Sequence, residues 1–271
     1  MTDWSAHARM SAAQRWERAS AAMGRGVTDA LVEFAAPQPG ERVLDVASGT
    51  GAPSLQVARR VGPRGTVVAT DISAEPLKIA EQRARERGLS NISFHRIDVH
   101  ELPFPADEFG LVTCRFAAMF FAGLPKALAE IWRVLRPGGR VAFACWGPFD
   151  QPYFQTTAQV VMRHMGRDIP PAAASMFKFG SPGTLASAFL QAGFGNAHDE
   201  LRTVPWTWPG SIQDLWEYFQ AVTVPFRPLF EGIAPEQQAG IEREVKLELE
   251  KYREGEEIKL TAQIVLSSAV K

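Results

Sequence analysis

The stretch VLDVASGTGAPSLQV, from Val43 to Val57, decides the fold of this chain. It begins as a short apolar run that contains Asp45, breaks into small residues around Gly49 and Gly51, and then resumes an apolar pattern. This order predicts a buried strand, a tight turn and the start of a helix. Because the turn before a helix presents backbone N–H groups to a ligand, the stretch indicates a binding site at the end of the first strand.

The composition favours a globular cytoplasmic protein. The chain has 271 residues and an apolar share of 46%, which is enough for a large core. Its formal net charge is -1, so no excess of positive charge suggests nucleic acid or an anionic membrane as a partner. No apolar run is long enough to cross a bilayer, and the N-terminal MTDWSAHARM lacks the apolar core of a signal peptide. Cys114 and Cys145 are predicted to be buried thiols, and no metal site is predicted.

Strands and helices alternate through the first half of the chain. Helical periodicity predicts helices up to about Val61, from Ser73 to Gly88 and from Leu124 to Leu135. The predicted strands between and around them are Arg42–Val46, Thr66–Thr70, Ile92–Ile97, Phe109–Arg115 and Arg140–Trp146. This order implies an α/β fold with a parallel sheet and a ligand at the carboxyl ends of its strands. We therefore expect the Gly49 loop, Asp71, Asp98 and Arg115 to converge on one edge.

The rest of the chain is less regular, and we expect it to complete a single domain, residues 1–271. Residues 1–40 are predicted to form one or two helices before the ligand-binding core, residues 41–148. Residues 149–180 and 209–257 are predicted to be insertions that form a helical lid, and residues 193–208 and 258–270 the final strands. Further helices are predicted at Ser181–Ala192, Ser211–Tyr218 and Pro235–Arg253.

The glycine turn does not match a nicotinamide site completely. A dinucleotide-binding turn has Gly or Ala at the last position of its pattern, where helix and strand pack closely, but this chain has Ser54 there. The departure disfavours a nicotinamide dehydrogenase.

Four segments together resemble the class I S-adenosylmethionine-dependent methyltransferases. VLDVASGTG resembles motif I of that family, and VVATDIS resembles the acidic end of its second strand. RIDVHELPFPADEFGLVTCRFA and LRPGGRVAF resemble the segments around the third, fourth and fifth strands. The chain most resembles the quinone-biosynthesis C-methyltransferase branch. The resemblance implies a Rossmann-like, doubly wound, mostly parallel seven-stranded sheet with helices on both faces.

The resemblance also implies a site for S-adenosyl-L-methionine, which leaves as S-adenosyl-L-homocysteine. Asp45 would orient the loop, Asp71 would accept hydrogen bonds from the ribose, and Ala47 replaces the first glycine of many relatives without abolishing binding. The implied cofactor-binding residues are Asp45, Ala47, Gly49, Gly51, Asp71, Ile72, Asp98, Val99 and Arg115. Three alternatives stay open: the glycines serve only a tight turn, Asp98 is a turn residue, and Arg115 pairs with a carboxylate.

The acceptor is expected to be a small apolar or aromatic molecule. Aromatic and Met residues gather at the strand ends and in the predicted lid, although most of them are also explained as core. The predicted pocket residues are Phe116, Met119, Phe120, Trp146, Tyr153 and Phe177. The candidates for a catalytic residue are Arg115, His100 and His164, and the sequence does not decide among them.

The sequence alone is also compatible with other functions. A protein that binds S-adenosylmethionine without transferring methyl, as a cyclase-like or regulatory protein would, fits the same motifs. A nucleic-acid methyltransferase is disfavoured, because Arg115-Phe116-Ala117-Ala118 replaces the Asn/Asp-Pro-Pro-aromatic motif after the fourth strand. We expect a monomer or homodimer without a nucleic-acid partner or membrane insertion.

Overall fold

The computed structural model describes residues 15–271, so the part of the predicted N-terminal helices before residue 15 lies outside the described residues. The chain divides into two compact units. Among the described residues, unit 1 comprises residues 15–27, 147–178 and 203–263, and unit 2 comprises residues 28–146, 179–202 and 264–271. The prediction of a single domain with insertions stays a prediction.

The central sheet has the order β3-β2-β1-β4-β5-β8-β6. The first five of these strands run parallel to one another, whereas β8 pairs antiparallel with β5. The sheet strands are β1 (Arg42–Val46), β2 (Thr66–Asp71), β3 (Ile92–Arg96), β4 (Phe109–Arg115), β5 (Leu135–Trp146), β6 (Gly195–Pro209) and β8 (Glu257–Val270), and the short β7 (Arg253–Glu254) pairs with β8. The strand order reverses between β1 and β4, which is where sheets of this kind bind ligands.

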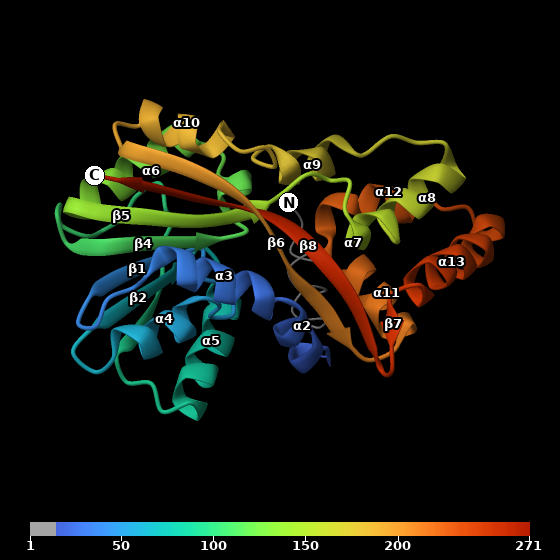
Figure 1. Cartoon of the computed structure of the whole chain (residues 1–271), viewed down its shortest axis with the longest axis horizontal. Coiled ribbons are helices and arrows are strands. Elements are labelled where there is room, and N and C mark those ends of the chain that lie inside the picture. Colours follow the sequence, from blue (N-terminus) through green and yellow to red (C-terminus); the bar gives the residue numbers. More distant parts are fainter. Residues whose placement is uncertain (1–14) are drawn as a thin grey trace. The chain divides into compact units, whose positions relative to one another are not determined.

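Helices cover both faces of the sheet in unit 2. Figure 1 shows α4 and α5 on one face and α6 and α10 on the other. The helices of this unit are α3 (Arg25–Ala35, which begins in unit 1), α4 (Ser54–Val61), α5 (Ala74–Glu86), α6 (Leu124–Val134) and α10 (Thr184–Gln191), with the 3₁₀ helix η1 (Ala118–Phe120). The interior is apolar: Phe143 on β5, for example, packs edge-on against Phe189 on α10 at 5.3 Å. The predicted mostly parallel, doubly wound α/β fold is therefore confirmed.

The predicted bounds of β1 and β4 agree with the structure and those of β8 agree to within one residue, whereas β5 is longer than predicted. Strand β5 begins at Leu135 because Leu135 pairs with Phe109 before a register shift, and Arg140 then pairs with Leu111. Strand β8 runs to Val270, the predicted end of the last strand, and Val270 pairs with Arg140. A bulge next to Pro137 and the two following glycines is a tertiary feature that local pattern does not predict.

An ion pair fastens β5 to the segment before β1. The Arg140 guanidinium donates to both carboxylate oxygens of Glu41, at 2.7 and 3.1 Å, and to the carbonyl oxygens of Ala35 and Ala36. The Glu41 side chain is only 3% exposed and also accepts from the backbone N–H of Gln38. Arg140 therefore both neutralises a buried carboxylate and caps the carbonyl end of α3.

Unit 1 contains mostly short helices around an aromatic cluster. Phe154 lies 5.0 Å from Phe177 and 5.9 Å from Phe226, and Tyr153 lies 5.2 Å from Phe219, all between ring centroids. The helices of this unit are α2 (Glu17–Met23), α7 (Pro152–Gln155), α8 (Ala158–Met165), α9 (Pro171–Ala174), η2 (Ser175–Phe177), α11 (Ile212–Val222), η3 (Val224–Phe226), α12 (Arg227–Glu231) and α13 (Pro235–Glu250). No helix among residues 15–271 is long and apolar enough to cross a membrane.

Candidate functional site

The glycine loop after β1 is joined to the end of β2 by one carboxylate. Asp71 accepts the backbone N–H of Gly49 on Oδ2 and the backbone N–H of Ser73 on Oδ1, both at 2.9 Å. The predicted convergence of the Gly49 loop and Asp71 is thus confirmed. Each carboxylate oxygen can accept more than one hydrogen bond, so Asp71 retains capacity for hydroxyl donors of a ligand.

Asp45 lies on β1, just before the glycine loop, and is fully buried. Its carboxyl accepts hydrogen bonds from the Ser54 hydroxyl at the start of α4 and from the Thr113 hydroxyl on β4, the latter at 2.6 Å. Asp45 therefore fastens the start of α4 to the middle of the sheet. This contact also explains why the chain has serine where a dinucleotide-binding turn has glycine or alanine, because the hydroxyl is needed for Asp45.

Burial raises the pKa of the Asp45 carboxyl from 3.8 to about 6, more than the two hydroxyl donors lower it. The folded protein thus holds this proton more tightly than the unfolded chain, and this contribution to stability is lost as the pH rises through about 6. Asp45→Asn cannot ionise, so its free energy of unfolding relative to the wild type should increase by about 2 kcal/mol between pH 4.5 and pH 7.5. Urea unfolding at both pH values measures it. Asp107→Asn, at an exposed position, is the control and should show no such increase. If the difference in free energy of unfolding between Asp45→Asn and the wild type were the same at both pH values, the raised pKa of Asp45 would be contradicted.

The two glycines of the loop are required for different reasons. Gly49 has φ +54°, and a Cβ added there would meet nothing within 4 Å, so the backbone faces open space. Gly51 has φ +100°, but its Cβ would lie 3.0 Å from Leu55 and 3.1 Å from Ala80. Open space therefore lies at Gly49, whereas Gly51 allows α4 and α5 to pack closely.

Ala47 adopts φ +53°, a left-handed conformation that costs a residue with a Cβ about 1 kcal/mol. Ala47→Gly should therefore stabilise the protein by about 0.5 kcal/mol, since glycine relieves the strain but gains freedom in the unfolded chain. Ala47→Val should destabilise it by about 2 kcal/mol, because β-branched residues tolerate this region worst. Chemical unfolding of the three proteins compares these values. Equal stability of the glycine and valine proteins would show that Ala47 is not strained.

Ile72 follows Asp71 and is unusually exposed for its type. Its side chain is 64% exposed, and its backbone carbonyl oxygen accepts from Nε of Arg96 at 3.0 Å. Another positive side chain, Arg83 on α5, donates to the carbonyl oxygen of Thr50 in the glycine loop at 2.9 Å. The exposed apolar side chain of Ile72 thus stands beside an acidic group at the end of β2, which suits a ligand with a flat apolar ring and hydroxyl groups.

Asp98 follows β3, next to β2 in the sheet, and is tied to His100. Its Oδ1 accepts the backbone N–H of His100 at 2.9 Å and lies 2.5 Å from Nδ1 of the same residue. The backbone N–H of Gly123 donates to Nε2 of His100 at 3.3 Å. These bonds to His100 lower the pKa of Asp98. Both ring nitrogens of His100 are engaged, so the candidate base is better placed to hold Asp98 than to abstract a proton. Val99 is buried beside them.

The end of β4 carries two aromatic rings. Phe116 has φ +55° and stacks on Trp146 at the end of β5, with centroids 4.3 Å apart and planes 11° apart. The Arg115 guanidinium carbon lies 5.2 Å from the centroid of the Phe116 ring, a cation–π contact. Met119 is buried and Phe120 is half exposed in η1. A positive φ is uncommon for a bulky residue and typical of a functional constraint.

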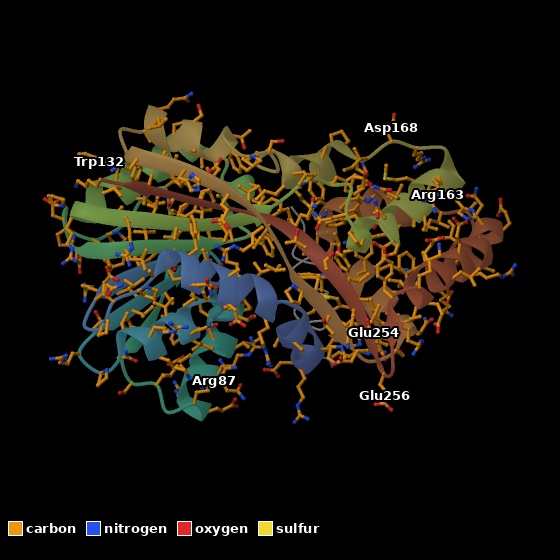
Figure 2. All side chains as sticks on the ribbon, in the orientation of Figure 1. Arg87, Trp132, Arg163, Asp168, Glu254 and Glu256 are labelled. Carbon is orange, nitrogen blue, oxygen red and sulfur yellow. The ribbon has the colours of Figure 1, made fainter. Side chains whose placement is uncertain are left out.

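The remaining predicted residues lie in unit 1. Tyr153 and Phe177 belong to the aromatic cluster, and burial raises the pKa of the Tyr153 hydroxyl. His164 on α8 lies 2.6 Å from Glu244 on α13, which also pairs with Arg163. Figure 2 shows Arg163 on α8 and Asp168 on the loop that follows. The roles predicted for Tyr153, Phe177 and His164 stay predictions.

The cysteines and the potential metal ligands are described next to complete the account of the site. Cys114 and Cys145 are buried free cysteines, as predicted. Between residues 15 and 271 there is no group of three His, Cys, Asp or Glu residues arranged to hold a metal ion.

Comparison with known proteins identifies the family. The model of the ubiE/COQ5 methyltransferase family matches residues 23–204. The chain belongs to this methyltransferase family. Nocamycin O-methyltransferase of Saccharothrix syringae is 34% identical over 218 residues, 71% of this chain and 77% of the relative.

Other relatives match shorter segments or the fold alone. The ubiquinone/menaquinone biosynthesis C-methyltransferase UbiE of Pseudomonas paraeruginosa is 40% identical over 111 residues, 41% of this chain and 43% of the relative. The chain therefore matches less than half the length of that protein. The crystal structure of the YcgJ protein from Bacillus subtilis has a TM-score of 0.57 at 21% identity, over 90% of this chain and 97% of that one.

The protein is thus a methyltransferase that uses S-adenosylmethionine, and its residues fit that cofactor. The open space beside Gly49 leaves room for it, Asp71 offers acceptors for hydroxyl groups, and the exposed Ile72 offers an apolar surface for a base. Sequence reasoning missed the contacts of Ser54, Thr113, Arg83 and His100. Only Ser54 had a signal, its departure from the dinucleotide pattern.

Proposed function

We propose that this methyltransferase acts on a small apolar or aromatic molecule. The observation that carries the proposal is the stacked pair of Phe116 and Trp146 at the carboxyl ends of β4 and β5, with Phe116 in a strained backbone conformation. These ends are adjacent to the glycine loop after β1, because β1 pairs with β4. Flat aromatic faces at this edge suit a flat acceptor. The relatives named for nocamycin and for quinone biosynthesis are consistent with acceptors of this size.

Within unit 2 we assign the cofactor as follows. Asp71 accepts hydrogen bonds from the ribose hydroxyls, and Ile72 covers one face of the adenine. Asp98 accepts from the adenine amino group, and Val99 supplies a backbone N–H. The loop from Ala47 to Gly51 lies against the methionine part and is held in place by Asp45. Arg115 ends β4 beside the methyl group.

The chemistry requires little of the protein beyond alignment. The sulfonium of the bound cofactor supplies an already activated methyl group. The residues at the strand ends then have to place the accepting atom in line with the bond that breaks and exclude water. A base is needed only if the accepting atom must lose a proton. Phe116, Met119, Phe120 and Trp146 are the pocket residues of unit 2 that we assign to the acceptor.

The balanced charge of the chain supports one further part of the proposal. A net charge of -1 gives no electrostatic attraction to nucleic acid, so we assign no such partner. We further propose a cytoplasmic location and a monomer or homodimer.

Three measurements test the proposed function. Calorimetric titration with S-adenosylhomocysteine, S-adenosylmethionine and NAD should show binding of the first two only. Incubation with methyl-labelled S-adenosylmethionine and a metabolite extract should then label small molecules, whereas added RNA should stay unlabelled. Phe116→Ala should raise the KM for the labelled acceptor about tenfold, because the stacked face is lost, with exposed Leu190→Ala as the control. Labelled RNA without any labelled small molecule would overturn the proposal.

A further inference from the structure

His100 is held at both ends of its ring by groups from two different loops. Its Nδ1 lies 2.5 Å from Oδ1 of Asp98, in the loop after β3. Its Nε2 lies 3.3 Å from the backbone N of Gly123, the residue before α6, and its ring packs edge-on against Phe121 at 6.1 Å. The imidazole thus bridges the loop after β3 and the loop before α6.

The contact with Gly123 fixes the tautomer of the neutral imidazole. A backbone N–H can only donate, so Nε2 must be the acceptor and cannot carry a proton. The proton of neutral His100 is therefore on Nδ1, where it donates to the Asp98 carboxylate. Asp98 receives a directed hydrogen bond from the ring, in addition to the one from the His100 backbone.

The two hydrogen bonds from His100 are accepted by the same carboxylate oxygen of Asp98, and the other oxygen takes part in neither of them. Both N–H groups of His100 bond to Oδ1, whereas Oδ2 has no partner among residues 15–271. The Asp98 side chain is 46% exposed, so Oδ2 is available to a ligand. Because the terminal torsion of aspartate is soft, the backbone bond alone would leave the carboxylate plane free to turn. The ring bond fixes that plane.

We propose that His100 is a positioning residue that aims Oδ2 of Asp98 at the amino group of the adenine. The inference rests on the proposed cofactor site, in which Asp98 contacts that group. The charge of Lys126 on α6 also lowers the pKa of Asp98, but Lys126 pairs with Glu101 at 3.1 Å and Arg133 pairs with Glu130, so neither cation replaces the directed bond from His100. No other side chain between residues 15 and 271 bonds to Asp98.

Two substitutions separate the two ends of the ring. His100→Asn places an amide N–H near the position of Nδ1, so it keeps the donor to Asp98 and loses the acceptor for Gly123. His100→Gln places its amide near Nε2, so it keeps the contact with Gly123 and loses the donor to Asp98. Affinity for S-adenosylhomocysteine, measured by calorimetry, should stay within about twofold in the Asn protein and fall about fivefold to tenfold in the Gln protein and in His100→Ala. His95→Ala, on the exposed end of β3, is the matched control.

A second ligand reports on the amino group itself. S-Inosylhomocysteine has a carbonyl oxygen in place of the adenine amino group, so it has no donor at that position and presents an acceptor to the Asp98 carboxylate. The wild type should prefer S-adenosylhomocysteine over it, and that preference should shrink at least threefold in His100→Ala but not in His95→Ala. A merely structural role of His100 would weaken both ligands equally and leave the preference unchanged. Thermal unfolding confirms that each variant is folded before titration.

The outcomes distinguish this inference from the proposed function. If the wild type does not bind S-adenosylhomocysteine, the cofactor site itself is wrong. If it binds but the Gln protein equals the wild type and the Asn protein does not, the bridge to Gly123 is what matters and the positioning of Asp98 is refuted. An unchanged preference in His100→Ala likewise refutes it.

Discussion

Asp71→Ala is expected to weaken the binding of S-adenosylhomocysteine about 100-fold, because the variant would lose the two charge-assisted hydrogen bonds to the ribose that we propose, at about 1.5 kcal/mol each. The carboxylate also receives the backbone N–H groups of Gly49 and Ser73, so the glycine loop loses its anchor to β2 in the same variant. Isothermal titration calorimetry of the wild type and the variant measures the change.

Two controls separate this affinity from stability. Glu86→Ala removes a negative charge at the end of α5, away from the loop, and should leave the affinity unchanged. Asp71→Asn retains one acceptor and should have intermediate affinity. Asp71→Ala should still unfold cooperatively, with a loss of about 1–2 kcal/mol from the two released N–H groups. If Asp71→Ala lowered stability but bound the ligand as tightly as the wild type, Asp71 would be a loop anchor only.

Arg140→Ala is expected to reduce the free energy of unfolding by about 3 kcal/mol, the largest stability effect of any substitution considered for this protein. The substitution leaves the Glu41 carboxylate buried without its partner and removes the donor for the last carbonyl groups of α3. The Arg140 side chain is 27% exposed, so water replaces part of the interaction. The expected loss of stability therefore lies at the lower end of the range for breaking a buried ion pair. Urea unfolding measures it directly.

The matched control is Arg136→Ala, which removes an exposed arginine from the same strand and should cost less than about 0.5 kcal/mol. The double variant Arg140→Met with Glu41→Leu should regain part of the loss, because a buried charge is then no longer unpaired. If the double variant were less stable than Arg140→Ala alone, the buried carboxylate would not be the source of the effect.

The sequence was sufficient for the parts of the fold that depend on local pattern. The bounds of β1, α4 and β4 follow from a short apolar run, a glycine turn and a helical repeat, and the structure agrees with them. The sequence also placed Asp71 correctly beside the Gly49 loop, since carboxyl ends of neighbouring parallel strands meet at one edge. Periodicity could not predict that Leu135 pairs with Phe109 across a bulge, because the partner strand decides it.

The contacts within the site were harder to predict for a similar reason. The pairing of Ser54 with Asp45 and of Asp98 with His100 depends on side-chain direction, which a one-dimensional pattern does not carry. Gly51 shows the same limit: its glycine is required by the packing of Leu55 and Ala80, which belong to two helices that the turn itself does not contain. The short helices of unit 1, such as α9 and α12, have too few residues for a repeat to be visible.

The division of the chain has a consequence for protein engineering. Unit 1 is assembled from three separate segments, and the chain passes between the units five times, after residues 27, 146, 178, 202 and 263. Strands β6 and β8 each continue from one unit into the other without interruption. Neither unit can therefore be exchanged as a cassette by a single cut and ligation. Transplanting the helical part of a relative into this protein would require three coordinated grafts, each with its own strand register preserved.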